Sequence, residues 1–425
     1  MKPTVLIATT DRWYPAARLG MALAKAGCRV EAVCPADHPI AKTSAVRDVC
    51  SYSGLAAVKS FGEAIARTKP DFVVSGDDLA TRHLQELHDR ARRLGDAGNS
   101  ICALIERSLG ASESFPIVYA RTAFIELARA EGLRAPATEV IHDKAGLRKW
   151  ISRVGLPTVL KADGTSGGDG VRVVHTAEEA EPAFQKLQAP PLLARAAKRA
   201  LLDRDKTLLA PSLLRRRSVV NAQTFVAGRE ATSAVFCWQG TVLASVHFEV
   251  LKKMHTAGHA TVLRLIEHPE MSYAVETMVR RLKLSGFHGF DFMLESHSGN
   301  AFLIEINPRT TQVGHLALGP GKDLPAALSA ALSGELVHES ARITEKDTIA
   351  LFPQEWMRDP ASEFLQSGYH DVPWEEPALV SDCIRKGQSQ RAWYSKPAPA
   401  PVRSAPLPLA VRPEPRAMKL DCEAK

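Results

Sequence analysis

Apolar and polar positions follow two alternating periods over the first hundred residues. Apolar runs at 5–9, 29–34 and 71–75 predict short strands, and the stretches 16–26 and 62–68 have helical spacing. This alternation predicts a small parallel sheet with helices on both of its faces. Because no Gly-x-Gly-x-x-Gly motif follows the first strand, the pattern disfavours a dinucleotide site.

Polar residues follow the first and third of these predicted strands. They are Thr9, Thr10, Asp11 and Arg12 after the first strand, and Asp77 and Asp78 after the third. The carboxyl ends of parallel strands are where ligands collect in open α/β sheets. Turn formation and helix capping explain the same residues equally well.

A second pattern, between residues 286 and 307, predicts a β-hairpin. Phe290, Phe292 and Leu294 alternate with Asp291, Met293 and Glu295, a polar turn follows at 296–300, and an apolar run returns at 301–306. Pro308 then ends the second strand.

The hairpin carries three oxygen-bearing side chains. Glu305 and Asn307 are two residues apart, so they share one face of their strand, and Asp291 can join them from the neighbouring strand. Mg²⁺ prefers oxygen ligands and commonly takes one or two carboxylates together with substrate phosphates. Arg309 follows directly, where a guanidinium can contact a transferring phosphoryl group. The alternative is an ordinary hairpin with solvated acids.

A strand that ends in a lysine and a glycine-rich loop precede the hairpin by about 125 residues. Residues 157–161 form the predicted strand, which ends at Lys161, and a second strand follows at 171–174. The loop between them contains Thr165, Ser166, Gly167, Gly168 and Gly170. Glycines let backbone amides approach an anion closely, so the loop is suited to covering phosphates, although an ordinary mobile turn has the same composition.

Together, in this order, the two segments resemble the ATP-grasp superfamily, whose members hold ATP between two α+β lobes. The resemblance implies that Lys161 contacts the α-phosphate and that the glycine-rich loop covers the triphosphate. It assigns Asp291, Glu305 and Asn307 to Mg²⁺, with Mn²⁺ as a substitute, and Arg309 to the reacting phosphate.

The resemblance extends to the nucleotide itself. Arg121 stands where the family has its first nucleotide-contacting basic residue. Residues 223–230 resemble the hinge that lines adenine, with the backbone of Phe225 and Val226 pairing with the base and Glu230 binding the ribose. Gln223 stands near the position where many members carry glutamate, which is a departure from the family pattern.

The resemblance and the local composition together divide the chain into six parts. These are a Rossmann-like domain (1–114), a first ATP-grasp lobe (115–193), a helical insertion (194–218), a second lobe (219–340), a C-terminal cap (341–394) and a disordered tail rich in proline (395–425). The expected fold class is therefore α/β and α+β.

Composition changes this picture little. The chain has 425 residues, a formal charge of +7 and seven cysteines without a Cys-x-x-Cys pair. This cysteine pattern favours neither a zinc site nor a disulfide framework. The sequence contains no nucleic-acid module signature, no apolar run of membrane-spanning length and no signal-peptide pattern, so we expect a cytoplasmic protein without nucleic-acid or membrane partners.

The function implied by the resemblance is ADP-forming ligation of a small carboxylate to an amine, or less often to a thiol, by an enzyme that is commonly a homodimer. One alternative is an enzyme that phosphorylates bicarbonate, such as a carboxylase or a carbamoyl-phosphate-synthase-like enzyme. Since a synthase of that type normally carries two grasp units and this chain shows one, a ligase is favoured. The other alternative is a non-catalytic ATP-binding protein.

Overall fold

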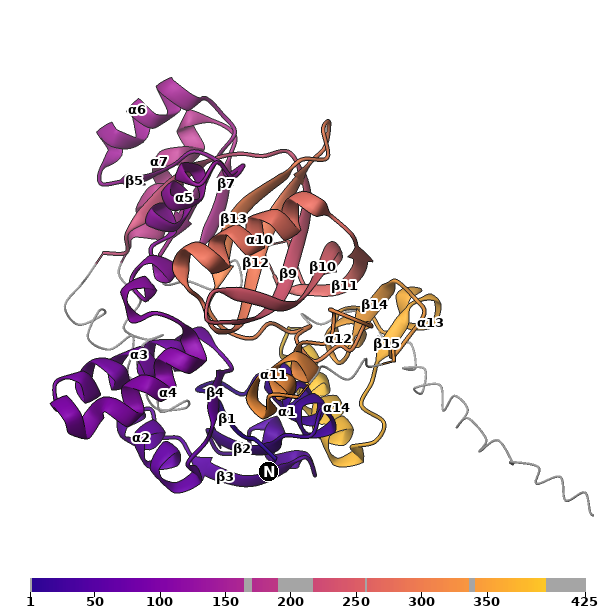
Figure 1. Cartoon of the computed structure of the whole chain (residues 1–425). Coiled ribbons are helices and arrows are strands. Elements are labelled where there is room, and N and C mark those ends of the chain that lie inside the picture. The colour runs from indigo at the N-terminus through magenta and orange to yellow at the C-terminus, as the bar shows by residue number, and fades with distance from the viewer. Residues whose placement is uncertain (1, 164–169, 190–216, 257, 336–340, 395–425) are drawn as a thin grey trace, which may run out of the picture.

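The computed structural model of the chain contains three β-sheets that meet around one central region (Figure 1). It describes residues 2–163, 170–189, 217–256, 258–335 and 341–394. The predicted helical insertion, apart from its last two residues, and the predicted disordered tail lie outside the described residues. Residues 164–169 of the glycine-rich loop, among them Thr165, Ser166, Gly167 and Gly168, also lie outside them.

The first sheet is the predicted parallel sheet. Its strand order is β3-β2-β1-β4, formed by β1 (Thr4–Ala8), β2 (Arg29–Cys34), β3 (Val46–Ser51) and β4 (Phe72–Ser75). The associated helices are α1 (Tyr14–Lys25), α2 (Ala57–Thr68), α3 (Asp78–Arg92) and α4 (Asn99–Leu109), with short 3-10 turns η1 (Pro39–Lys42) and η2 (Gly95–Gly98). Val5 and Ile7 face a core shared with α1, whereas Leu6 and Ala8 face a core shared with α2, α3 and α4. The expectation of helices on both faces is confirmed.

The second sheet is antiparallel, with the order β5-β8-β6-β7. It contains β5 (Thr138–Ile141), β6 (Thr158–Ala162), β7 (Val171–Val174) and β8 (Val220–Thr224), and it packs against α6 (Lys144–Val154) and α7 (Ala177–Gln188). The chain thus returns to this sheet through β8 before it continues into the third sheet. A division at residue 219 would place β8 in the other lobe, apart from the strands with which it pairs.

The third sheet has seven strands in the order β13-β12-β9-β10-β11-β14-β15. They are β9 (Gly228–Trp238), β10 (Thr241–Lys253), β11 (Ala260–Ile266), β12 (Gly286–Glu295), β13 (Ala301–Asn307), β14 (Thr348–Leu351) and β15 (Tyr369–Asp371). The helices around it are α5 (Arg121–Ala130), α10 (Pro269–Leu282), α11 (Leu324–Ser333), α12 (Gln354–Arg358), α13 (Phe364–Ser367) and α14 (Pro377–Tyr394), and the turns η3 (Ser112–Ser114) and η4 (Ile117–Tyr119) precede α5. Strands β14 and β15, from the segment expected as a cap, extend the sheet.

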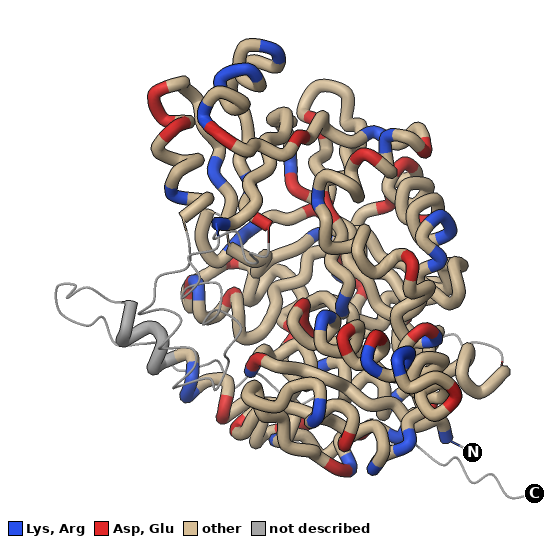
Figure 2. Tube along the Cα trace, turned by 90° about the vertical axis from the view of Figure 1, so that its left-hand side faces the viewer, with Lys and Arg blue, Asp and Glu red and all other residues tan. Residues whose placement is uncertain are grey.

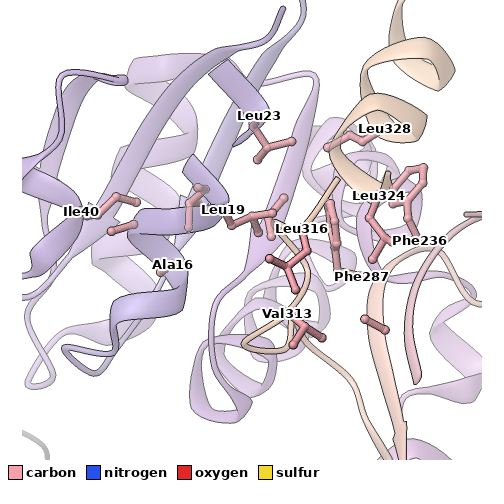
Figure 3. Close-up of a cluster of buried hydrophobic side chains, with 14 of the residues drawn as sticks. Ala16, Leu19, Leu23, Ile40, Phe236, Phe287, Val313, Leu316, Leu324 and Leu328 are labelled. Carbon is pink, nitrogen blue, oxygen red and sulfur yellow. The ribbon is translucent and has the colours of Figure 1, made fainter. Parts of the chain in front are cut away.

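The seven-stranded sheet has a different partner on each face. Alternate residues such as Val235 and Phe236 point to opposite sides. The Val235 side packs against α5 and α10. The Phe236 side packs against α11 and, through Val313 and Leu316, against Leu19 of α1 (Figure 3). The N-terminal domain and the large sheet therefore share one hydrophobic core.

A buried ionic cluster closes the same junction. Asp371 of β15 accepts hydrogen bonds from Arg18 of α1 and from His315 Nε2, the latter at 2.7 Å. Burial raises the pKa of Asp371, but His315 and Arg18 overcome this effect and the net pKa is lowered. Three distant segments of the chain are thereby joined at a single carboxylate.

Charges are mixed over the rest of the molecule. In the view of Figure 2, basic and acidic positions alternate over the described residues without forming a continuous basic stripe. Among the described helices, none is both long and apolar enough to cross a membrane.

We predict that Asp371→Asn lowers the free energy of unfolding by about 3–5 kcal/mol, because it leaves Arg18 buried without a carboxylate. The control is Asp347→Asn, since Asp347 is 64% exposed in its pair with Arg342 and its loss should cost less than about 1 kcal/mol. Urea unfolding midpoints of the two variants would measure the difference. Equal midpoints would show that the cluster does not hold the junction.

Candidate functional site

The predicted hairpin is present, and its register brings the two carboxylates together. Asp291 of β12 lies directly opposite Glu305 of β13, and Gly289 lies opposite Asn307. Asp291 accepts hydrogen bonds from Thr232 Oγ1 at 2.8 Å and from Asn307 Nδ2 at 2.9 Å. Thr232 had no signal in the sequence, because its position depends on the pairing of β9 with β12.

Burial, followed by the neighbouring charge of Glu305, raises the pKa of Asp291 to about 6. Glu305 behaves in the opposite way: burial raises its pKa, but the positive charges of Lys161 and Arg121 outweigh burial and the net shift is downward. Two negative charges on Asp291 and Glu305 would therefore repel each other at this buried position. A divalent cation would relieve this repulsion.

The donor set fits Mg²⁺ after one change. Asn307 donates its Nδ2 to Asp291, and its Oδ1 accepts from Arg309 at 3.3 Å, so the amide oxygen is turned away from the carboxylate pair. Rotation of the amide would add this oxygen to Asp291 and Glu305. Among the described residues, no group of three or more His, Cys, Asp or Glu side chains has an arrangement suited to a metal. Two carboxylates and an amide are nevertheless sufficient when substrate phosphates complete the coordination.

Lys161 faces this pair from the other lobe. It lies on β6, is 7% exposed, and has Glu305, Asp291 and Glu230 as its acidic neighbours. Burial lowers the pKa of Lys161, and these carboxylates only partly oppose the effect. Within the described residues its ammonium forms no hydrogen bond or ion pair. A buried ammonium without a partner is costly, which points to an anionic ligand.

Arg121 connects the two lobes at the same point. It begins α5, its Nε lies 3.3 Å from Glu305 Oε2, and its Nη1 donates to the carbonyl of Ala162 and lies 3.8 Å from Asp163 Oδ1. Asp163 also accepts from Asn221 Nδ2 at 2.8 Å. Sequence reasoning missed Asp163, although its spacing of two from Lys161 was a usable signal.

The expected adenine segment connects β8 to β9. The backbone groups of Phe225 and Val226 form no hydrogen bond within the described residues and remain available to a ligand. Gln223 is buried and donates to Thr138 Oγ1 at 3.0 Å, so its side chain supports the sheet. Glu230 pairs with Lys253 at 2.6 Å. Gly170, after the undescribed part of the glycine-rich loop, accepts from the amide of Ala162 through its carbonyl oxygen.

Arg309 points toward the N-terminal domain. Its Nε lies 3.2 Å from Asp78 Oδ2, and its Cζ lies 5.4 Å from the centroid of the Trp13 ring. The backbone around it is also attached to that domain, because Thr310 N donates to Ser75 O at 3.1 Å. Burial lowers the pKa of Arg309, but Asp78 more than compensates and the net pKa is raised.

The polar residues after the first and third predicted strands now divide into two roles. Asp77 caps α3 through Ala80 N and accepts hydrogen bonds from Thr9 and Thr10, so capping accounts for it. Asp78 instead holds Arg309 at the edge of the site.

The chain is similar to known proteins in sequence over one segment and in fold over most of its length. Residues 121–318 match the family model described as the carbamoyl-phosphate synthase L chain, ATP binding domain. The matched segment covers 198 of the 425 residues and supports the resemblance to the ATP-grasp superfamily. It spans Arg121, Lys161 and the hairpin, while no curated protein matches the sequence significantly.

Solved structures show the same ATP-grasp fold over most of the chain. N5-carboxyaminoimidazole synthetase from Staphylococcus aureus has a TM-score of 0.55 at 14% identity, over 80% of this chain and 79% of that one. The biotin carboxylase domain of Hydrogenobacter thermophilus 2-oxoglutarate carboxylase, solved with MgADP, ADP and bicarbonate, has a TM-score of 0.56 at 14% identity, over 80% and 71%. Biotin carboxylase from Campylobacter jejuni has a TM-score of 0.55 at 13% identity, over 80% and 72%. At these identities the likeness establishes the fold.

We predict that Asp291→Asn stabilises the Mg²⁺-free protein at neutral pH. The native pKa of about 6 exceeds the ordinary value of 3.8. Between these values the native state therefore binds more protons than the unfolded state, and wild-type stability falls as pH rises through this window. The gain at pH 7.5 should be on the order of 1–2 kcal/mol, because water at the half-buried site screens part of the repulsion.

The measurement is the unfolding midpoint of variant and wild type from pH 4 to 8, in buffer containing a chelator. Glu295→Gln, at the far end of the same strand, is the control. If the difference in unfolding midpoint between Asp291→Asn and wild type did not grow with pH, repulsion between Asp291 and Glu305 would not be the source of the instability.

A second prediction concerns the buried ammonium. Lys161→Met should raise the melting temperature of the nucleotide-free protein, because it removes an unpaired charge, and should weaken ATP binding by at least about tenfold. Lys149→Met, at an exposed position on α6, is the control. If Lys161→Met lowered the melting temperature without changing ATP binding, the lysine would be structural.

Proposed function

We propose that this ATP-grasp protein is an ADP-forming ligase that phosphorylates a substrate carboxylate and couples it to an amine. The observation that carries the proposal is the convergence of Lys161, from one lobe, with the Asp291–Glu305 pair from the other. Within the described residues, a buried lysine without a partner lies beside two carboxylates that repel each other. A bound metal–triphosphate complex would neutralise both kinds of charge.

Each residue has a role in this proposal. The backbone of Phe225 and Val226 pairs with adenine. Glu230 leaves its ion pair with Lys253 and binds the ribose hydroxyls instead. Lys161 and Arg121 bind phosphate oxygens. Asp291, Glu305 and Asn307 hold Mg²⁺ or Mn²⁺, which neutralises charge on the phosphates when bound. Gly170 and the preceding loop residues cover the triphosphate.

The chemistry proceeds in two transfers. A carboxylate oxygen of the substrate attacks the γ-phosphorus, the bond to ADP breaks, and an acyl phosphate forms. The amine nitrogen then attacks the acyl carbon, loses a proton and releases phosphate; a thiol would react in the same way. Phosphoryl transfer depends on positioning and charge neutralisation rather than on a protein nucleophile. Arg309 is held near the reacting group by Asp78 and Trp13.

Bicarbonate is the second candidate for the phosphorylated acid. The observation in its favour is that two of the similar structures are biotin carboxylases, one of them solved with bicarbonate. The two candidates differ only in the acid, since both release ADP and phosphate.

The test is release of ADP, AMP and phosphate from Mg-ATP with pooled carboxylates and amines, in buffer freed of bicarbonate. We expect ADP and phosphate in equal amounts, and a loss of at least about 100-fold in the Lys161→Met variant, since Lys161 would neutralise charge on the reacting triphosphate.

Release of AMP would contradict the acyl-phosphate mechanism. Release of ADP only after bicarbonate is restored would favour the second candidate. ATP binding without release of either nucleotide product would favour a non-catalytic protein.

A further inference from the structure

Arg82 is a guanidinium at the edge of the candidate site that forms no ion pair with any described residue. It lies in the first two turns of α3 and is exposed. Its Cζ lies 4.7 Å from the centroid of the Tyr119 ring, an arrangement that holds the cation in place. Within the described residues it forms no hydrogen bond or ion pair.

The ring beneath Arg82 is itself connected to the catalytic hairpin. Tyr119 donates its hydroxyl to the backbone oxygen of Asp78 at 3.1 Å, and the carboxylate of Asp78 pairs with Arg309. Arg82 is therefore fixed by the same residue that orients Arg309. Both cations sit where the N-terminal domain meets the exit of β13.

The charge of Arg82 also acts on Asp163, two residues after Lys161. Burial raises the pKa of Asp163, while Arg121, a hydrogen bond from Asn221 and the charge of Arg82 act in the opposite direction. Arg121 contacts both Glu305 and Asp163, and the charge of Arg82 acts on Asp163 as well. Arg82 also stacks on Tyr119, which is hydrogen-bonded to Asp78, the partner of Arg309.

The two arginines assigned to the site and one farther along α3 each form an ion pair with a carboxylate, which Arg82 does not do within the described residues. Arg121 faces Glu305, and Arg309 pairs with Asp78. Farther along α3, Arg90 pairs with Glu86 at 2.5 Å. Arg82 alone among these four combines a fixed position with unused donors, and a guanidinium offers a planar fork that matches a carboxylate or a phosphate.

We propose that Arg82 binds a second anionic group of the carboxylate substrate, so that the protein acts on acids bearing two anionic groups. One carboxylate of the acid lies near Arg309 for phosphorylation, and the second group, a carboxylate or a phosphate, lies at Arg82. This inference rests on the ligase function proposed above, which it deepens by naming the substrate class.

The experiment compares matched acids that differ by one anionic group. Protein saturated with Mg²⁺ and a non-hydrolysable ATP analogue is titrated calorimetrically with butyrate against succinate, pentanoate against glutarate, and serine against O-phosphoserine. The variants are Arg82→Gln and Arg82→Lys, with Arg90→Gln as the control from the same helix. ADP release is measured in parallel with the same acids and pooled amines.

We expect wild type to bind at least one dianionic acid tenfold or more tightly than its match. Arg82→Gln should abolish this preference without changing the affinity for the ATP analogue, Arg82→Lys should keep part of it, and Arg90→Gln should keep all of it. The succinate and O-phosphoserine arms distinguish a carboxylate from a phosphate.

Three results would overturn the inference: no preference in wild type, a preference that survives Arg82→Gln, or an equal loss of nucleotide affinity in that variant. Failure of the proposed function is a separate outcome. A dianionic preference at Arg82 without ADP release would keep the subsite and refute the ligase, whereas ADP release with monoanionic acids alone would do the reverse.

Discussion

The hydrophobic core shared by α1 and the seven-stranded sheet is the contact on which the rest of the structure depends. Leu19 packs with Leu316 and Phe236 in this core, and the Asp371 cluster closes its edge. Since the segment containing Val313 and Leu316 directly follows Arg309, burying it fixes the exit of β13 against the end of β4. The N-terminal sheet therefore contributes Asp78 to a site whose carboxylates come from the hairpin.

Charge at the site is arranged for a ligand and is incompletely balanced within the protein. Within the described residues, Lys161 is buried without a partner and Arg82 has donors but no acceptor, while Asp291 is held beside Glu305. The buried Lys161 and the carboxylate pair lower the stability of the ligand-free protein, and a metal–triphosphate complex would relieve both; the exposed Arg82 is hydrated and offers its donors to an anionic acid. By contrast, the equally buried charges of the Asp371 cluster are paired with one another, as expected of a structural contact.

Local pattern was sufficient for part of the site. The alternation of Phe290, Phe292 and Leu294 predicted the strand, and the spacing of Glu305 and Asn307 predicted their common face, because side chains alternate strictly along a strand. The same reasoning could not orient Arg309, which follows the strand in a turn. It also could not show that Asn307 uses its amide nitrogen toward Asp291, since that depends on the neighbours present in three dimensions.

The sequence by itself determined the hairpin, the parallel first sheet and the strand that carries Lys161, but not β3, β5 or β8 to β11. The elements that it determined depend on periodicity and on turn residues, which act over a few neighbours. Only the tertiary structure decided that β8 returns to the first-lobe sheet, that β14 and β15 extend the third, and that Arg82 stacks on Tyr119 near Asp163. Those arrangements require segments that are well separated along the chain to pack together, and no local pattern encodes which surfaces meet.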